Sequence, residues 1–264
     1  MNNLLQVVLL GIIEGVTEFL PISSTGHLLI AERLGLGRRS ELFNIVIQAG
    51  AILAVTVIYW PRISSIVRGL RDPEQRGYAL KLALAFVITA GLGLVVAKLG
   101  VELPETVTPI AWALVVGGFW ILLAEWLAAR QAEQTEVTWL VAVVVGVAQI
   151  VAGIFPGTSR SGATIFAAML AGTSSRRAAT EFSFLVGIPT MYAASGYALL
   201  KQSKHGFDGE PWSDVAVGFV VSMVTAFIVI KWLLRYIQTH RFTPFAYYRI
   251  VLGVALLWLL PSGS

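Results

Sequence analysis

Long apolar stretches separated by short polar segments repeat along the whole chain. Each stretch is long enough to cross the ~30 Å hydrocarbon layer of a membrane as a helix. Pro, Gly or charged residues separate each stretch from the next. The pattern predicts six membrane-spanning helices, at about 42–59, 80–97, 109–128, 182–200, 215–234 and 245–260.

Two further apolar segments, about 4–34 and 139–172, are interrupted near their middle by the polar sequences PISSTGH and PGTSRSG. Each interruption leaves two half-helices that are too short to cross the membrane comfortably. Non-helical backbone survives at membrane depth only where protein buries it or where it lines a wet cavity. We therefore expect two re-entrant helix-loop-helix hairpins, each of which enters and leaves the membrane on one side.

The two hairpins also resemble each other in sequence. GIIEGVTEFLPISSTGHLLI and GVAQIVAGIFPGTSRSGATI align at an offset of 135, which pairs Pro21 with Pro156 and Ser24 with Ser159. Three predicted spans follow each hairpin, and an odd number of spans turns the second copy upside down, as in many transporters. We predict one all-α membrane domain, residues 1–264, built from inverted repeats at about 4–128 and 139–260.

Composition supports this class of protein. The chain is 56% hydrophobic and 13% charged, whereas soluble domains carry roughly 25% charged residues. The N-terminal MNNLLQVVLL lacks the basic region of a signal peptide, so we expect it to belong to the folded domain. The absence of cysteine excludes disulfides and thiolate chemistry. With so few charges, the net charge of +4 indicates basic cytoplasmic loops, and we expect no nucleic-acid partner.

Basic residues are unevenly distributed between the two sides of the predicted membrane domain. The side that contains the 61–81 connection is richer in them, so it should face the cytoplasm. The first hairpin then enters from outside, the second from inside, and the C-terminus lies outside. The richer side carries Arg62, Arg68, Arg71, Arg76, Lys81, Arg130, Arg176, Arg177, Arg235 and Arg241, and the other side Arg33, Arg38, Arg39, Lys98, Lys201 and Lys204.

Glu14 and Glu18 are four residues apart, so on a helix they share one face. Two carboxylates in a low-dielectric setting need a cation, a proton or an arginine beside them. One interpretation is a structural ion pair with Arg160. The other is a divalent-metal site on Glu14 and Glu18, holding Mg²⁺ or Ca²⁺, with phosphate oxygens and water as the remaining ligands. That interpretation indicates a phosphorylated substrate.

The loop PISSTGH places hydroxyls and a histidine before a half-helix that should begin near Leu28. An N-cap accounts for one of the three hydroxyls. A helix N-terminus also binds anions, and Ser24 with His27 would supply a nucleophile and a proton carrier. Taken alone, His27 also fits a packed hydrogen-bond donor.

The loop PGTSRSG opens the second half-helix, and its small residues permit a close approach of backbone to ligand. Arg160 can grip a phosphate through two hydrogen bonds or merely neutralise Glu14 or Glu18. The GK[ST] ending of a nucleotide-binding loop is missing, so nucleotide hydrolysis finds no support. We expect the other residues of both loops to bind the substrate: Ser23, Thr25, Gly26, Gly157, Thr158, Ser159, Ser161 and Gly162.

Two charged residues outside the loops are interpreted as structural. Glu181 should cap or pair at the entry of the 182–200 helix. Arg249, near a predicted membrane face, should extend its charged end toward water.

Four motifs, EGVTEFLPISSTGH at 14–27, PGTSRSG at 156–162, EFSFLVGIP at 181–189 and TPFAYYRI at 243–250, closely resemble the undecaprenyl-pyrophosphate phosphatase family, also called bacitracin-resistance proteins. The resemblance covers essentially the whole chain. It implies an enzyme of the bacterial cytoplasmic membrane that hydrolyses undecaprenyl pyrophosphate to the monophosphate and recycles the lipid carrier for cell-wall synthesis. It also implies divalent-metal dependence and functional roles for Glu14, Glu18, Ser24, His27 and Arg160.

Several alternatives stay open at this point. Ser24, a metal-activated water or His27 could form the bond to phosphorus, and a homodimer is left open. We expect the site to open toward the outer face, where the pyrophosphate enters while its polyprenyl tail stays in lipid. The rival function is a secondary transporter or flippase of polyprenyl phosphate, because inverted repeats with broken helices are typical of transporters.

Overall fold

The computed structural model describes residues 2–100, 106–203 and 211–259, and all regular secondary structure in these ranges is helical. The helices follow the order and most of the boundaries that the apolar pattern predicts. They are α1 (Asn3–Thr17), α2 (Ser24–Ala31), the π-helix η1 (Glu32–Leu36), α3 (Glu41–Arg68), α4 (Pro73–Lys98), α5 (Val107–Ala128), α6 (Trp139–Ile154), α7 (Arg160–Leu170), α8 (Arg176–Ser203), α9 (Trp212–Tyr236) and α10 (Thr243–Leu259).

Five of these helices, α3, α4, α5, α8 and α9, are long and apolar enough to cross a membrane. The predicted span at 245–260 corresponds to α10, which has only 17 residues. Two positions used in the predictions lie outside the described residues. They are residue 260, which ends the last predicted span, and Lys204, one of the basic residues used to predict the orientation. The described helices therefore define a multi-pass membrane protein.

Three helices extend well beyond their predicted spans, α3 past a proline at its C-terminal side and α4 (Pro73–Lys98) and α8 at their N-terminal sides. The predicted span 42–59 lies within α3, which passes Pro61 and ends at Arg68. The predicted span 182–200 lies within α8, which begins at Arg176 and contains Pro189. Hydropathy delimits only the apolar part of a helix, and proline is tolerated in membrane helices whose neighbours support the freed backbone groups.

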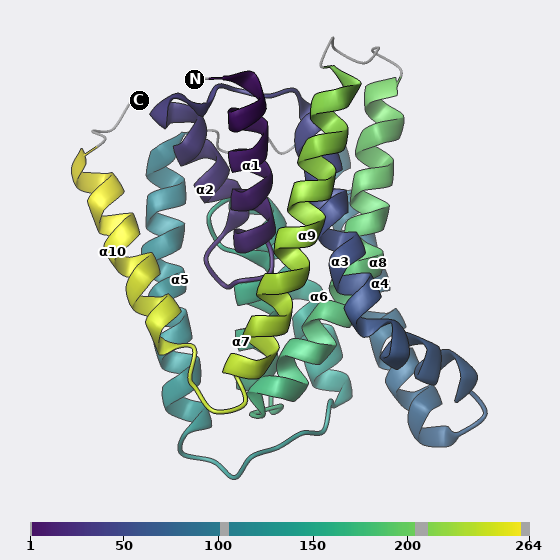
Figure 1. Ribbon diagram of the computed structural model, residues 1–264. Coiled ribbons are helices and arrows are strands. Elements are labelled where there is room, and N and C mark those ends of the chain that lie inside the picture. The colour runs from purple at the N-terminus through teal and green to yellow at the C-terminus, as the bar shows by residue number, and fades with distance from the viewer. Residues whose placement is uncertain (1, 101–105, 204–210, 260–264) are drawn as a thin grey trace.

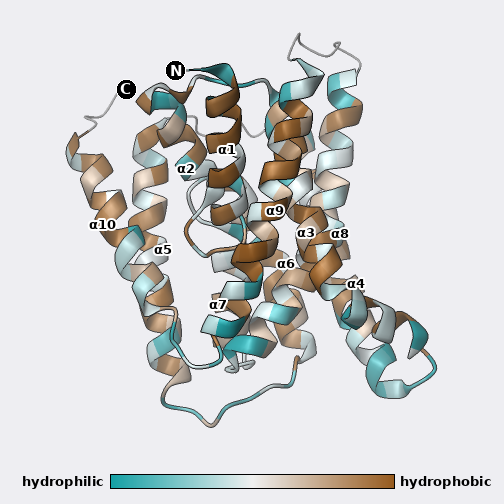
Figure 2. Ribbon diagram, in the orientation of Figure 1, coloured by the Kyte–Doolittle hydropathy of each residue, from teal (hydrophilic) through white to brown (hydrophobic). Residues whose placement is uncertain are grey.

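Several of the helix contacts are repeated when the two halves of the chain are exchanged. Helix α9 packs against α1 and α3, while α4 packs against α6 and α8. The pairs α5–α10 and α3–α8 each join corresponding helices of the two halves. Figure 1 shows α1 beside α9 and α5 beside α10. Figure 2 shows hydrophobic residues along these helices and hydrophilic residues at the turn between α3 and α4.

Candidate active site

The two half-helices α2 and α7 begin with the same backbone geometry. Ser23 caps α2 with φ 75°, and its side chain accepts a hydrogen bond from the Gly26 amide at 3.3 Å. Ser159 caps α7 with φ 70°, and its side chain accepts from the Gly162 amide at 3.2 Å. Few non-glycine residues adopt a positive φ, so this shared feature is specific. The two caps are structural equivalents.

This equivalence corrects the loop alignment, which paired Ser24 with Ser159. The second loop contains one more residue between its proline and its cap. Gly157 turns there with φ 95°, and a Cβ at this position would lie 2.7 Å from the carbonyl oxygen of Ile110 on α5. Only glycine combines that φ with so close an approach to a neighbouring helix.

The first residues of the two half-helices, Ser24 and Arg160, both bind Glu18. The Ser24 hydroxyl donates to Oε2 of Glu18, and Nη2 of Arg160 donates to Oε1, each at 2.5 Å. The Glu18 side chain is only 4% exposed. The buried carboxylate of Glu18 therefore joins two other residues that the sequence singled out, one from each loop.

Glu14 lies one helical turn before Glu18 on α1 and is 2% exposed. The side chains of these two glutamates interact, and the charge of Arg160 acts on Glu14 as well. Arg160 supplies one positive charge to this pair of buried carboxylates, and their hard oxygen atoms suit Mg²⁺ or Ca²⁺. The donor set therefore fits a divalent cation.

The protein would supply few of that cation's ligands. Across the described ranges, no group of three or more His, Cys, Asp or Glu side chains gathers at one point. Mg²⁺ commonly binds proteins through one or two carboxylates and takes its other ligands from phosphate and water. A pair of glutamates is consistent with that mode of binding.

His27 is held at both ring nitrogens. Nδ1 lies 2.6 Å from the carbonyl oxygen of Ser23, and Nε2 lies 2.7 Å from the hydroxyl oxygen of Tyr248 on α10. The structure thus pairs His27 with Tyr248 and Ser24 with Glu18, rather than pairing His27 with Ser24 directly. Tyr248 belongs to the motif TPFAYYRI, but the sequence did not single it out.

The remaining loop residues divide into two groups. The hydroxyls of Ser159 and Ser161 donate to the carbonyl oxygen of Leu20, at 3.4 and 3.0 Å, so they tie the second loop to the first. Thr25 is exposed, Gly26 is buried near α5, and Thr158 and Gly162 lie at the start of α7. Their contacts with substrate, like those of Ser23 and Gly157, stay predictions.

Arg249 on α10 is a residue whose importance the sequence did not reveal. It is 1% exposed, so the expectation that it extends toward water is wrong. Its guanidinium instead donates to backbone carbonyls, which satisfy its donors without a carboxylate. These carbonyls come from both loops and from α5: Pro21 at 3.0 Å, Thr158 at 2.9 Å, Gly157 at 3.0 Å, Ala113 at 2.9 Å and Leu114 at 3.3 Å.

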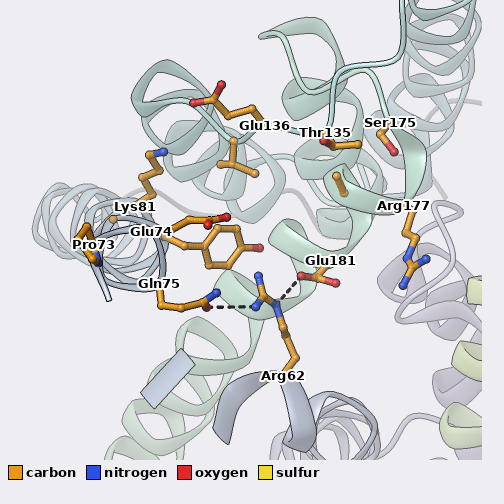
Figure 3. A pocket seen from close by; sticks show the side chains of 14 residues that line it. Arg62, Pro73, Glu74, Gln75, Lys81, Thr135, Glu136, Ser175, Arg177 and Glu181 are labelled. Atoms are coloured by element: carbon orange, nitrogen blue, oxygen red, sulfur yellow. Dashed lines mark hydrogen bonds and ion pairs between the residues drawn. The ribbon is translucent and has the colours of Figure 1, made fainter. Parts of the chain in front are cut away.

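A large polar cavity lies away from these loops, at the end of the bundle that contains the 61–81 connection. Its volume is about 670 Å³. Figure 3 shows Arg62 between Gln75 and Glu181, donating to Glu181 at 2.8 Å and to Gln75 at 3.2 Å. The expected pairing of Glu181 is thereby confirmed. None of the predicted catalytic residues lines this cavity, and the gathered charges around Glu18 identify the loop site better than volume does.

The fold and these loops define a multi-pass membrane protein with a buried polar site where two broken helices meet. The site combines two carboxylates, an arginine, a serine and a histidine, which suits a phosphate-bearing ligand. The family model described as "Bacitracin resistance protein BacA" matches residues 7–255, and the chain belongs to this family.

Curated relatives extend the similarity over the whole chain. The chain is 68% identical over 260 residues to an undecaprenyl-diphosphatase of Rhizobium etli (strain CIAT 652), with 98% of each chain covered. It is 59% identical over 265 residues to an undecaprenyl-diphosphatase of Xanthomonas oryzae pv. oryzae (strain PXO99A), with 100% of each covered. The resemblance seen in the motifs is confirmed.

Proposed function

We propose that this protein hydrolyses undecaprenyl pyrophosphate to undecaprenyl phosphate and inorganic phosphate, and so recycles a lipid carrier for cell-wall synthesis. The observation that carries the proposal is the Glu18 carboxylate, which binds the Ser24 hydroxyl and the Arg160 guanidinium at once. The names of relatives at 59–68% identity support it. Membership of the bacitracin-resistance family agrees with the same activity.

The pyrophosphate would bind between the starts of α2 and α7, while its polyprenyl tail remains in lipid. Helix N-termini present free N–H groups and partial positive charge to an anion. Arg160 would hold phosphate oxygens with its planar pair of donors. Glu14 and Glu18 would hold the divalent cation, which when bound would neutralise part of the pyrophosphate charge.

In this proposal the Ser24 oxygen attacks the terminal phosphorus. A Ser–O–P bond forms, the bond from phosphorus to the bridging oxygen breaks, and undecaprenyl phosphate leaves. The Ser24 proton passes to Glu18, the acceptor to which its hydroxyl already donates. Water then attacks the phosphorus of the phosphoserine and gives a proton to His27, the Ser24 oxygen takes back the proton held by Glu18 as the Ser–O–P bond breaks, and inorganic phosphate leaves. Arg160 would stabilise the spreading charge.

Phosphate release by purified protein in detergent tests the activity. Wild-type protein should release phosphate from undecaprenyl pyrophosphate in the presence of Mg²⁺ or Ca²⁺. Glu18→Gln should release almost none, while Glu74→Gln, an exposed control, should match wild type. Transport of polyprenyl phosphate without phosphate release by folded wild-type protein would favour the transporter alternative.

Rapid-quench labelling tests the nucleophile. With substrate labelled on the terminal phosphate, digestion should recover the label on the peptide that contains Ser24. Label on His27, or absence of a labelled peptide under conditions that trap a known phosphoserine enzyme, would contradict attack by Ser24.

We also infer how the helices sit in the bacterial cytoplasmic membrane. With 17 residues, α10 reaches the lower end of the length that a span needs, ~17–25 residues. It would be the sixth span, because it packs along α5. The pairs α1–α2 and α6–α7 would be re-entrant hairpins of two inverted repeats. Tag accessibility in the 61–81 loop tests the orientation, since labelling from the cytoplasmic side alone is expected.

A further inference from the structure

Tyr248 reaches His27 from the opposite end of the chain. Its hydroxyl oxygen lies 2.7 Å from Nε2 of His27, and the two ring planes are within 10° of parallel. The neighbouring Arg249 anchors this part of α10 to the carbonyls of Pro21 and Thr158. Tyr248 is therefore presented to His27 from a backbone that is itself fixed to both loops.

The hydrogen bonds of His27 define its tautomer. A carbonyl oxygen can only accept, so the contact between Nδ1 and the Ser23 carbonyl at 2.6 Å places a hydrogen on Nδ1. In the neutral ring, Nε2 then carries the lone pair and accepts from the Tyr248 hydroxyl. The ring is held at one end by the cap of α2 and at the other end by α10.

This arrangement occurs in only one of the two half-helices. With Ser23 and Ser159 as equivalent caps, the position of α7 that corresponds to His27 is Ala163. The histidine thus belongs to the first half of the chain and its partner Tyr248 to the second. The adjacent Tyr247 is 59% exposed on the same helix and offers a matched comparison.

We propose that Tyr248 is a positioning residue for the hydrolysis. Together with the Ser23 carbonyl, it fixes the orientation and tautomer of His27, so that Nε2 carries the lone pair and exchanges protons through the Tyr248 hydroxyl that it contacts. This inference rests on the proposed function, because His27 needs a defined orientation only if it carries protons during the reaction. Without the tyrosine hydroxyl, the imidazole would rotate among several orientations and be correctly placed for a smaller fraction of the time.

Steady-state kinetics test the role in catalysis. Tyr248→Phe should lower kcat about tenfold, a part of the ~10²–10⁴-fold that general acid–base catalysis contributes, and leave KM near its wild-type value. Tyr247→Phe should match wild type. In a His27→Gln background, the additional Tyr248→Phe change should have no further effect. The same tenfold loss in that background, or a raised KM with unchanged kcat, would overturn the proposal.

Nitrogen-15 NMR of histidine-labelled protein tests the pairing independently of activity. The His27 signals are those that disappear in His27→Gln. Neutral His27 should have a protonated Nδ1 and an unprotonated Nε2, and Tyr248→Phe should move the Nε2 signal while Tyr247→Phe leaves it in place. Unchanged His27 signals in Tyr248→Phe would overturn the proposal. If wild-type protein shows this pairing but releases no phosphate, the proposed function is contradicted while the pairing of Tyr248 with His27 still stands.

Discussion

Ser24 and Arg160 occupy the same position in two half-helices, and each binds a different oxygen of Glu18. Each is the first residue after a serine cap with positive φ. The same local geometry therefore delivers a hydroxyl from the first loop and a guanidinium from the second to one carboxylate. The two loops differ in chemistry while sharing their backbone.

A lysine should not replace Arg160 in function, although it carries the same charge. We expect Arg160→Lys to lower kcat for phosphate release by about 100-fold, the loss typical of removing one electrostatic stabiliser of a transition state. An ammonium is a point charge and does not reproduce the planar pair of donors. Initial rates of phosphate release measure the effect. Arg177→Lys, an exposed arginine of the polar cavity, should keep the wild-type rate, and a normal rate in Arg160→Lys would remove that residue from the site.

Removal of divalent metal should stop the reaction. Treatment with EDTA is expected to abolish phosphate release, and added Mg²⁺ or Ca²⁺ should restore it. Glu14→Gln should require a higher metal concentration for half-maximal rate, because one of the two hard carboxylate ligands is lost. The measurement is the rate of phosphate release as a function of metal concentration. Glu136→Gln, at an exposed position, is the control and should reach half-maximal rate at the same metal concentration as wild type. Full activity after chelation would count against a metal site at Glu14.

Gly157 should not tolerate even a methyl group. Gly157→Ala would impose a side chain at φ 95° and bring its Cβ within 2.7 Å of the Ile110 carbonyl oxygen. We expect the second loop to shift, with a loss of about 1–3 kcal/mol in stability from backbone strain and a lower rate of phosphate release. Gly153→Ala is the matched control, because a Cβ there meets no atom within 4 Å. Thermal unfolding in detergent measures both, and equal melting temperatures would show that the loop accommodates the methyl group.

Arg249 should contribute mainly to stability. Arg249→Met leaves five backbone carbonyls without their donor. Since hydrogen bonds to charged groups contribute about 1.5–3 kcal/mol each, we expect a loss of at least about 3 kcal/mol and reduced activity. Unfolding by a denaturing detergent measures the change. Arg235→Met, at an exposed position of α9, should unfold like wild type; if the two variants behave alike, the carbonyl contacts of Arg249 contribute little.

Much of the site could be predicted from the sequence because its elements are local. Pro21 and Pro156 interrupt apolar segments, and the i, i+4 spacing of Glu14 and Glu18 places both on one face of α1. The structure then brings Glu18, Ser24 and Arg160 together. Prolines, helical spacing and charged residues within apolar segments can all be recognised directly in the amino-acid sequence.

The contributions of α10 left no such signature. Arg249 binds backbone carbonyls, which every residue possesses, so the sequence alone does not indicate its partners. Tyr248 meets His27 across 221 residues of chain. The correct alignment of the second loop with the first also depends on a turn at Gly157, and this turn is evident only from the φ of that residue. Hydropathy found the helix but not the side of it that faces the loops.

Arg249 follows Pro21 by 228 residues of chain, which sets the order in which the contacts of the site can form during synthesis. Glu18 and Ser24 are made well before the helix that carries Arg249. Until that helix has been made, the carbonyls of Pro21 and Gly157 lack the guanidinium that links them. The two loops can therefore be tied together through Arg249 only after α10 has been synthesised.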